Sequence, residues 1–210
     1  TQDEVRYPCQ RLPHPISATR LTPTSAPDTS SMPSISEKFA ERRAEGRATL
    51  VPYVTSGFPS RSASVDVLTG LVEAGGDVLE LGIPFSDPLA DGPTSEDSTV
   101  RALEGGMTVE GTLEVLAEFR RLSDAPIVLF SYFNPLLQYG LEAFLADAEE
   151  AGAQGLLLTD VPTGADSEVE GAILDSALDL IRLVAPTTSP DRASSLAHQG
   201  QGSPHYSSRT

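Results

Sequence analysis

The acidic residues of one stretch, LELGIPFSDPLADGPT at positions 79–94, are the side chains of this sequence that are best placed for chemistry. The stretch begins with an apolar, strand-forming run that carries Glu80. It breaks at Pro84 into a proline-rich loop that carries Asp87 and Asp91. A buried strand would therefore deliver the carboxylate of Glu80 next to an acidic loop. Because a buried carboxylate is costly unless it is paired or hydrogen-bonded, Glu80 is the first residue to explain.

Two interpretations of these carboxylates follow from the residues alone. In the first, Glu80 forms a satisfied ion pair inside the fold, while Asp87 and Asp91 only cap turns. In the second, Glu80 is a functional carboxylate, because buried acidic groups are rare unless they are paired or functional. The residue types leave both interpretations open.

Other kinds of site find little support in the sequence. The three histidines, His14, His198 and His205, are scattered, and the single cysteine, Cys9, lies in the N-terminal tail, so we expect no metal site. Ser86 has no paired histidine or activating motif and is not a credible nucleophile. The sequence also has no Walker-type phosphate loop.

Composition and charge narrow the class of protein. A chain of 210 residues, of which 39% are hydrophobic, suits one domain with a real core. The net charge of −16 argues against nucleic acid and anionic membranes as partners, because both attract clustered positive charge. Cys9 can form no intrachain disulfide, and no apolar run approaches the roughly 20 residues that a membrane span needs. We therefore expect a cytoplasmic protein.

Short strand-forming runs alternate with amphipathic helical stretches along the chain. Ser34 and Glu37 have the spacing of a capping box, which predicts the start of a helix. Near-continuous apolar strands separated by helices indicate a parallel sheet covered by helices, an α/β fold. The predicted strands are residues 49–55, 78–84, 127–132, 155–162, 178–186 and 204–208. The predicted helices are residues 62–75, 109–122, 141–152, 167–177 and 189–200, with a further helical region around 102–103.

The stretch at 79–94 closely resembles the signature of the tryptophan synthase alpha chain family, and the resemblance runs from about Glu37 to Thr210. The resemblance implies a (β/α)8 TIM barrel, of which this chain contains about six β/α units. In such barrels the catalytic groups lie at the carboxyl ends of the strands. The residues of this sequence that fall there are Glu80, Asp91, Asn134, Asp160 and Pro186.

The resemblance implies a carbon–carbon lyase of tryptophan biosynthesis, which cleaves indole-3-glycerol phosphate to indole and glyceraldehyde 3-phosphate by a retro-aldol reaction. Matched to the motif of the family, Glu80 is the general acid and then the general base, and Asp91 accepts a hydrogen bond from the indole N–H. Four residues match the indole pocket of the family. Periodicity alone predicts each of them equally well to be a core residue. Those residues are Tyr53, Thr55, Phe130 and Leu157.

The resemblance also implies a partner, the tryptophan synthase beta subunit, which takes indole onward in an α2β2 heterotetramer. Pyridoxal phosphate is expected only in that subunit, and no cofactor is expected in this chain. The proline-rich loop suits docking, because few of its backbone bonds rotate and little entropy is lost on binding. The residues implied to contact the partner are Pro84, Asp87, Pro88 and Asn134.

The sequence departs from the family at both ends. We expect a disordered N-terminal extension at residues 1–33, with Met32 as a candidate natural start, and an incomplete TIM-barrel domain at residues 34–210. The resemblance implies that a mobile loop and two further β/α units, which hold the substrate phosphate, follow residue 210. We therefore expect the chain as given to have little or no turnover. Two local departures are the acidic run at 95–100 and the residues Pro204 and His205, which stand where an apolar, aromatic strand is expected.

Three hypotheses about function remain at this point. The first is the alpha-chain lyase, with Glu80 and Asp91 in the reaction. The second is a catalytically impaired alpha-like module that only binds and modulates the beta subunit. The third is another sugar-phosphate barrel, such as an epimerase, which the stretch around Glu80 disfavours because such enzymes want metal-ligating histidines at their strand ends.

Overall fold

The computed structural model describes residues 32–89, 91–199 and 204–206. At its centre is a sheet of five parallel strands, in which each strand pairs with the next one along the sequence. The strands are β1 (Tyr53–Thr55), β2 (Leu79–Gly82), β3 (Ile127–Ser131), β4 (Gly155–Leu158) and β5 (Asp179–Ile181). An unbroken order of neighbouring parallel strands is the arrangement of a barrel wall, so the predicted α/β class is confirmed.

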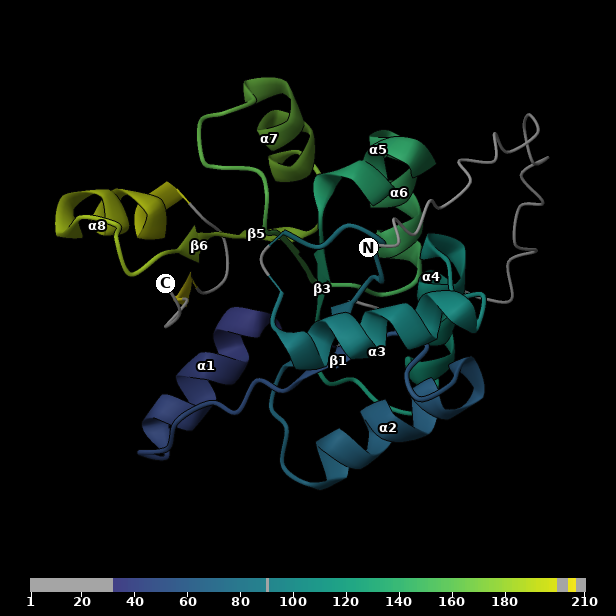
Figure 1. The fold of residues 1–210 in the computed structure, drawn as a ribbon. Helices are drawn as coiled ribbons and strands as arrows, with labels where there is room; N and C mark the ends of the chain where they lie inside the picture. Colours follow the sequence, from purple (N-terminus) through teal and green to yellow (C-terminus); the bar gives the residue numbers. More distant parts are fainter. Residues whose placement is uncertain (1–31, 90, 200–203, 207–210) are drawn as a thin grey trace, which may run out of the picture.

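Helices connect these strands and surround the sheet (Figure 1). The helices of the described residues are α1 (Ile35–Ala44), α2 (Arg61–Glu73), α3 (Pro93–Glu104), α4 (Val109–Phe119), α5 (Phe133–Tyr139), α6 (Leu141–Glu150), α7 (Ser167–Leu174) and α8 (Pro190–Gln199). In these ranges of the chain, no helix combines the length and the apolar character that crossing a bilayer requires.

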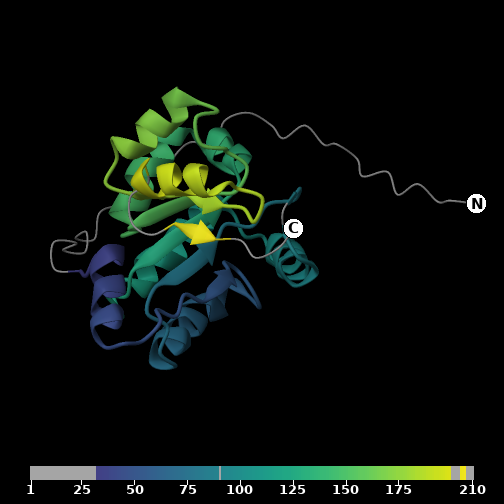
Figure 2. The ribbon, with the colours of Figure 1, turned by 90° about the vertical axis from the view of Figure 1, so that its left-hand side faces the viewer.

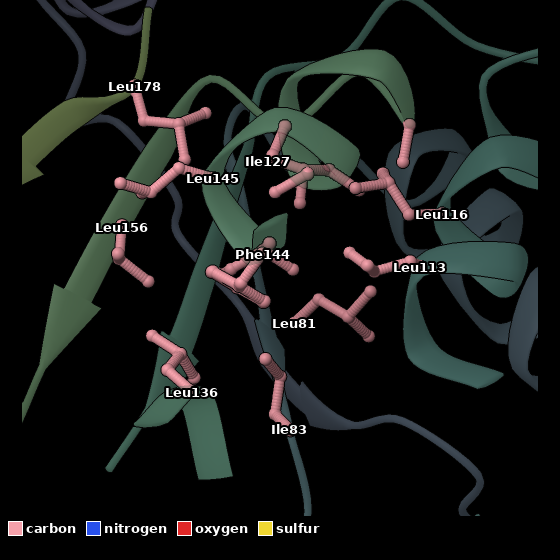
Figure 3. Packing of buried hydrophobic residues seen from close by; sticks show 14 of the residues in the cluster. Leu81, Ile83, Leu113, Leu116, Ile127, Leu136, Phe144, Leu145, Leu156 and Leu178 are labelled. Atoms are coloured by element: carbon pink, nitrogen blue, oxygen red, sulfur yellow. The ribbon is translucent and has the colours of Figure 1, made fainter. Parts of the chain in front are cut away.

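The sheet has two apolar faces, because successive residues of a strand point to opposite sides. Leu79 and Leu81 of β2 point to the outer face, where they join the large core between the sheet and the helices. Figure 3 shows this core, with Leu116 of α4 and Phe144 of α6 packed towards the strands. The inner face carries a smaller cluster made of Ile35, Val78, Val128, Leu157 and Ile181, with Phe39, Val51 and Phe130 packed against it.

Helix α1 closes the amino end of the inner face. Its start is the predicted capping box: the Glu37 N–H donates to Ser34 Oγ at 3.2 Å, and the Ser34 N–H donates to Glu37 Oε2 at 2.7 Å. Ile35 then inserts against the first residue of β4, Gly155, where an added Cβ would lie 2.9 Å from Ile35 Cδ1. A larger residue at position 155 would require Ile35 to shift, so glycine favours this close approach.

Several strands are shorter than the sequence predicts. β1 begins at Tyr53 instead of residue 49, because Pro52 has no N–H to give to the ladder. The Pro52 carbonyl still accepts a hydrogen bond of 2.9 Å from the Glu80 N–H. The predicted strands at 78–84 and 155–162 end at Gly82 and Leu158, before the prolines that follow them.

Helix α5 is absent from the prediction, which placed only a break at Asn134 and Pro135. The structure starts α5 at Phe133, so Pro135 lies in the first turn. The first N–H groups of a helix have no partner within it, so a missing N–H there costs little. Proline at this position therefore marks a helix start.

The predicted strand at 178–186 is divided into β5 and β6 (Leu183–Val184). β6 pairs in parallel with β7 (His205–Tyr206), and Leu183 lies opposite His205. Figure 2 shows β7, in yellow, in front of the blue and teal strands. Pro204 lies before β7, and residues 207 and 208 of the strand predicted at 204–208 lie outside the described residues, as do residues 1–31 of the predicted N-terminal extension.

Candidate active site

Glu80 lies on the inner face of the sheet, because it alternates with the outward-pointing Leu79 and Leu81. Its exposure is only 7%. In the register of the sheet, Glu80 stands between Tyr53 of β1 and Val128 of β3. The strand thus delivers a carboxylate to an otherwise apolar interior, as the sequence predicts.

The described contact of the Glu80 carboxylate comes from the far end of the chain. His205 Nδ1 lies 3.0 Å from Glu80 Oε1, although 125 positions separate the two residues. The hydrogen bond with Glu80 raises the pKa of His205, and this effect outweighs burial, which alone would lower it. β7 therefore completes the surroundings of Glu80.

An aromatic wall stands beside Glu80. The ring of Phe130 on β3 makes a T-shaped contact with the Tyr53 ring at a centroid distance of 5.3 Å and with the His205 ring at 6.4 Å. Tyr53 lies directly over Gly82, where an added Cβ would meet the Tyr53 hydroxyl oxygen at 2.2 Å. A glycine two residues after Glu80 is thus the reason that the tyrosine can cover this part of the sheet.

Asp91 reaches the same region through the loop that follows β2. Tyr132, directly after β3, donates its hydroxyl to Asp91 Oδ1 at 2.9 Å. The ring of Phe85 packs against that of Tyr132 at a centroid distance of 5.5 Å, which gives the loop a second anchor. Burial is the main cause of the raised pKa of Tyr53, and the negative charges of the nearby Asp91 and Glu80 carboxylates raise this pKa further. Both carboxylates thus act on one tyrosine hydroxyl.

Two residues predicted to line the indole pocket are more deeply buried than the aromatic pair. Thr55 is 2% exposed, and its Oγ1 lies 2.6 Å from Ser98 Oγ on α3. This hydrogen bond ties α3 to the end of β1. Leu157 is fully buried in the inner cluster. Their positions agree with core packing, while Tyr53 and Phe130 form the part of the wall next to the carboxylate.

The residues predicted to contact a partner lie around the carboxyl ends of β2 and β3. Asp87 and Asn134 are exposed, and Pro88 is half-buried. Pro84 is buried, so within this set it shapes the loop instead of presenting a surface. The neighbouring Leu89 is 86% exposed, which is unusual for a leucine.

A cavity of about 210 Å³ lies at the carboxyl ends of β4 and β5, beside α7. Its polar lining includes Thr159, Glu170 and Arg182, and Arg182 Nη2 donates to Glu170 Oε2 at 2.8 Å. Glu80 and Asp91 do not line it. The predicted acid–base residues and this cavity therefore occupy different places in the fold.

Two residues of the site were not assigned a role from the sequence. Tyr132 carries no motif, and its only signal is its place as the last residue of a predicted strand. His205 was noted as a departure from an aromatic strand, but its contact with Glu80 depends on where β7 docks. Among the described residues, no group of three or more histidine, cysteine, aspartate or glutamate side chains could hold a metal ion.

Comparison with known proteins identifies the family. The family model described as tryptophan synthase alpha chain matches residues 39–210. The structure of the tryptophan synthase alpha subunit from Legionella pneumophila is 36% identical with a TM-score of 0.79, over 85% of this chain and 68% of that chain. The Mycobacterium tuberculosis tryptophan synthase structure in its aminoacrylate-bound form is 36% identical with a TM-score of 0.77, over 82% of this chain and 70% of that chain.

A tryptophan synthase complex from Pyrococcus furiosus is also similar, with 36% identity and a TM-score of 0.69 over 72% of this chain and 63% of that chain. The identities are well above the level at which only a fold is shared, and the family match includes both Glu80 and Asp91. The parallel sheet described above is therefore part of a TIM barrel. The chain belongs to the tryptophan synthase alpha chain family.

Proposed function

We propose that this chain provides the acid–base group of the alpha reaction, the cleavage of indole-3-glycerol phosphate to indole and glyceraldehyde 3-phosphate, and that this group is Glu80. The observation that carries the proposal is the position of Glu80, a carboxylate 7% exposed on the inner face of the barrel beside the rings of Tyr53 and Phe130. Partly apolar surroundings suit a carboxyl group that must both give and accept a proton.

The reaction needs one proton to be given and one to be taken. Protonated Glu80 gives its proton to C3 of the indole ring, and the positive charge that develops on the ring is stabilised at N1. Glu80, now a carboxylate, takes the proton of the C3′ hydroxyl group. The bond between C3 and C3′ then breaks, its electron pair returns to the ring, and the C3′ oxygen becomes the aldehyde of glyceraldehyde 3-phosphate. Glu80 ends in its starting state.

Asp91 is the residue that we assign to the indole N–H. A carboxylate aimed at N1 stabilises the positive charge of the protonated ring, because it is already oriented before the charge forms. The hydrogen bond from Tyr132 supports that orientation, since it holds Asp91 Oδ1. Tyr53 and Phe130 supply flat apolar walls suited to an indole ring.

The partner in this proposal is a tryptophan synthase beta subunit, in an α2β2 assembly in which pyridoxal phosphate belongs to the beta subunit. The supporting observation is the rim of exposed residues around the carboxyl ends of β2 and β3, which includes Asp87, Leu89 and Asn134. The Pyrococcus furiosus match is a structure of a tryptophan synthase complex. This chain needs no cofactor of its own for the proton transfers described above.

The test is indole release from indole-3-glycerol phosphate by the chain mixed with a beta subunit, for the wild type and for Glu80→Gln. We expect the substitution to lower kcat about 1,000-fold, because glutamine can neither give nor take the proton. Glu96→Gln is the matched control, since Glu96 is exposed in the first turn of α3 and should leave kcat unchanged. Both variants should still activate the beta subunit.

A second arm of the test joins the chain to the C-terminal segment of a relative, because the chain spans 68% of the Legionella protein. If neither form releases indole while both activate the beta subunit, the proposal is wrong and the chain is a binding module. If Glu80→Gln keeps most of its activity in a form that works, the assignment of Glu80 is wrong.

A further inference from the structure

His205 joins the C-terminal strand to the proposed acid–base group. Its backbone is held by β7, where the His205 N–H donates to the Arg182 carbonyl at 2.9 Å and His205 stands opposite Leu183. Its side chain crosses to β2 and places Nδ1 3.0 Å from Glu80 Oε1. His205 is therefore held both by its backbone and by its imidazole ring.

The two groups can share a proton without moving. An ionised carboxylate only accepts hydrogen bonds, so Nδ1 carries the proton when Glu80 is charged. A protonated carboxyl group donates, so Nδ1 accepts when Glu80 is neutral. The same contact at 3.0 Å serves both arrangements, which differ only in the position of one proton. A lysine or an arginine could not fill this role, because each keeps its proton near neutral pH and so does not become an acceptor, whereas a histidine does.

Other titratable groups lie around the pair. Asp91 in the loop after β2, Glu80 and Tyr132 after β3 each raise the pKa of Tyr53 on β1. The hydroxyl of Tyr132 is directed at Asp91, and that of Tyr53 lies 3.4 Å from Thr55 Oγ1. Phe130 covers the imidazole with an apolar ring edge. Glu80 is thus the group whose hydrogen bond and charge govern the protonation of His205.

We propose that His205 is a positioning residue for the lyase reaction, a proposal that rests on the function proposed above: it shares one proton with Glu80, holds the carboxyl group beside the aromatic wall and returns the proton for delivery to the substrate. In the resting site the proton lies on Nδ1. As the substrate binds, the proton passes from Nδ1 to Glu80 Oε1 and then to indole C3. When Glu80 takes the proton of the C3′ hydroxyl group, that proton returns to Nδ1.

This sharing predicts how kcat depends on pH. The pair keeps its proton at higher pH than an ordinary histidine would, because Glu80 raises the pKa of His205. Activity falls once the pH exceeds that pKa, since no proton is then left for indole C3. Without the imidazole, Glu80 must hold the proton alone, so the fall in activity begins at lower pH.

The first experiment compares the pH profiles of kcat for the wild type, His205→Asn and His205→Phe. Asparagine places an N–H donor close to the position of Nδ1 but does not titrate, while phenylalanine keeps the ring and its contact with Phe130. We expect the alkaline limb to move to lower pH in both variants, with kcat lowered about tenfold at pH 8 and KM nearly unchanged. If His205 only supported the fold, its substitution would change KM or the amount of folded protein. The pH at which kcat falls would then stay the same.

Tyr206→Phe is the matched control, because Tyr206 is the next residue of β7 and is 63% exposed. Its profile should coincide with that of the wild type. If the limb of His205→Asn also coincides with that of the wild type, His205 does not share its proton and the proposal is overturned.

The second experiment needs no turnover. NMR titration of the three histidines follows the His205 signal, assigned by its loss in His205→Asn, in the wild type and in Glu80→Gln. We expect the pKa of His205 to fall in Glu80→Gln, because glutamine provides no negative charge. An unchanged pKa overturns the sharing of the proton whatever the activity is. Absence of indole release from both the chain and its extended form instead overturns the proposed function, and the titration then decides the contact between His205 and Glu80 by itself.

Discussion

Two carboxylates near β2, three positions apart, show how the two ends of this barrel differ. Asp77 lies at the amino end and Glu80 towards the carboxyl end, and their exposures are nearly equal at 5% and 7%. Asp77 is paired with an arginine, since Arg42 Nε of α1 lies 2.5 Å from Asp77 Oδ1. Glu80 is paired with a histidine. The nature of the partner, and not the depth of burial, separates the two residues.

The arginine helps to keep Asp77 charged at neutral pH. Burial alone would raise the pKa of Asp77, but the hydrogen bond from the Leu50 N–H and the contact with Arg42 hold it below its usual value. An arginine never loses its proton near neutral pH, so this pair can only stabilise the fold. A histidine titrates close to neutral pH, so its pair with Glu80 can exchange a proton. The first interpretation of the sequence was that Glu80 forms an ion pair inside the fold. Such a pair with a histidine is therefore compatible with the catalytic role that we propose for Glu80.

The largest effect on stability should come from the closed amino end. Ile35→Ala removes most of a side chain that is 2% exposed and packs in the inner cluster. We expect the free energy of unfolding to fall by about 3 kcal/mol, measured by urea denaturation, because a cavity remains. The control is Leu89→Ala, whose side chain is 86% exposed and whose loss should change stability by less than about 0.5 kcal/mol. Equal effects for the two variants would contradict the view that α1 closes the amino end of the inner face.

A smaller effect is expected for Asp77→Ala. This change leaves the Leu50 N–H and Arg42 without their acceptor, so the free energy of unfolding should fall by about 2 kcal/mol at pH 7. The pKa of Asp77 is lowered by folding, so its stabilisation is present above its unfolded pKa of about 3.9 and is lost as the pH falls through the folded value. Denaturation curves at pH 7 and in acid should therefore show the difference shrink in acid. A difference that grows in acid would contradict the pairing.

The smallest effect on stability is expected for His205→Phe, and its dependence on pH should be the opposite. Folding raises the pKa of His205, so its stabilisation is complete below the unfolded pKa of about 6.5 and is lost as the pH rises through the higher folded value. The partly exposed pair should contribute less than about 1 kcal/mol. Denaturation of both proteins at pH 6 and at pH 9 checks the sign. A difference that increases towards pH 9 would show that the imidazole is not charged in the pair.

Local signals in the sequence were enough for most elements of this fold. The capping box at Ser34 predicted the start of α1, and the apolar run of β3 predicted a buried strand. Prolines limited the accuracy at strand ends, since Pro52 shortens β1 and Pro135 starts a helix where a break was expected. Propensity and periodicity act over a few residues, so they locate elements well and their boundaries less well.

The sequence by itself determined that Glu80 is a strand residue before an acidic loop. The resemblance of the sequence to a family indicated the lyase reaction. Only the tertiary structure decided which groups surround it. The contacts of Glu80 with His205 and of Asp91 with Tyr132 join residues 125 and 41 positions apart. Such contacts depend on strand register and on how the sheet curves, which are set by the packing of the whole domain. One short segment, Asp77 to Glu80, therefore presents one carboxylate that stabilises the fold and another that we assign to proton transfer.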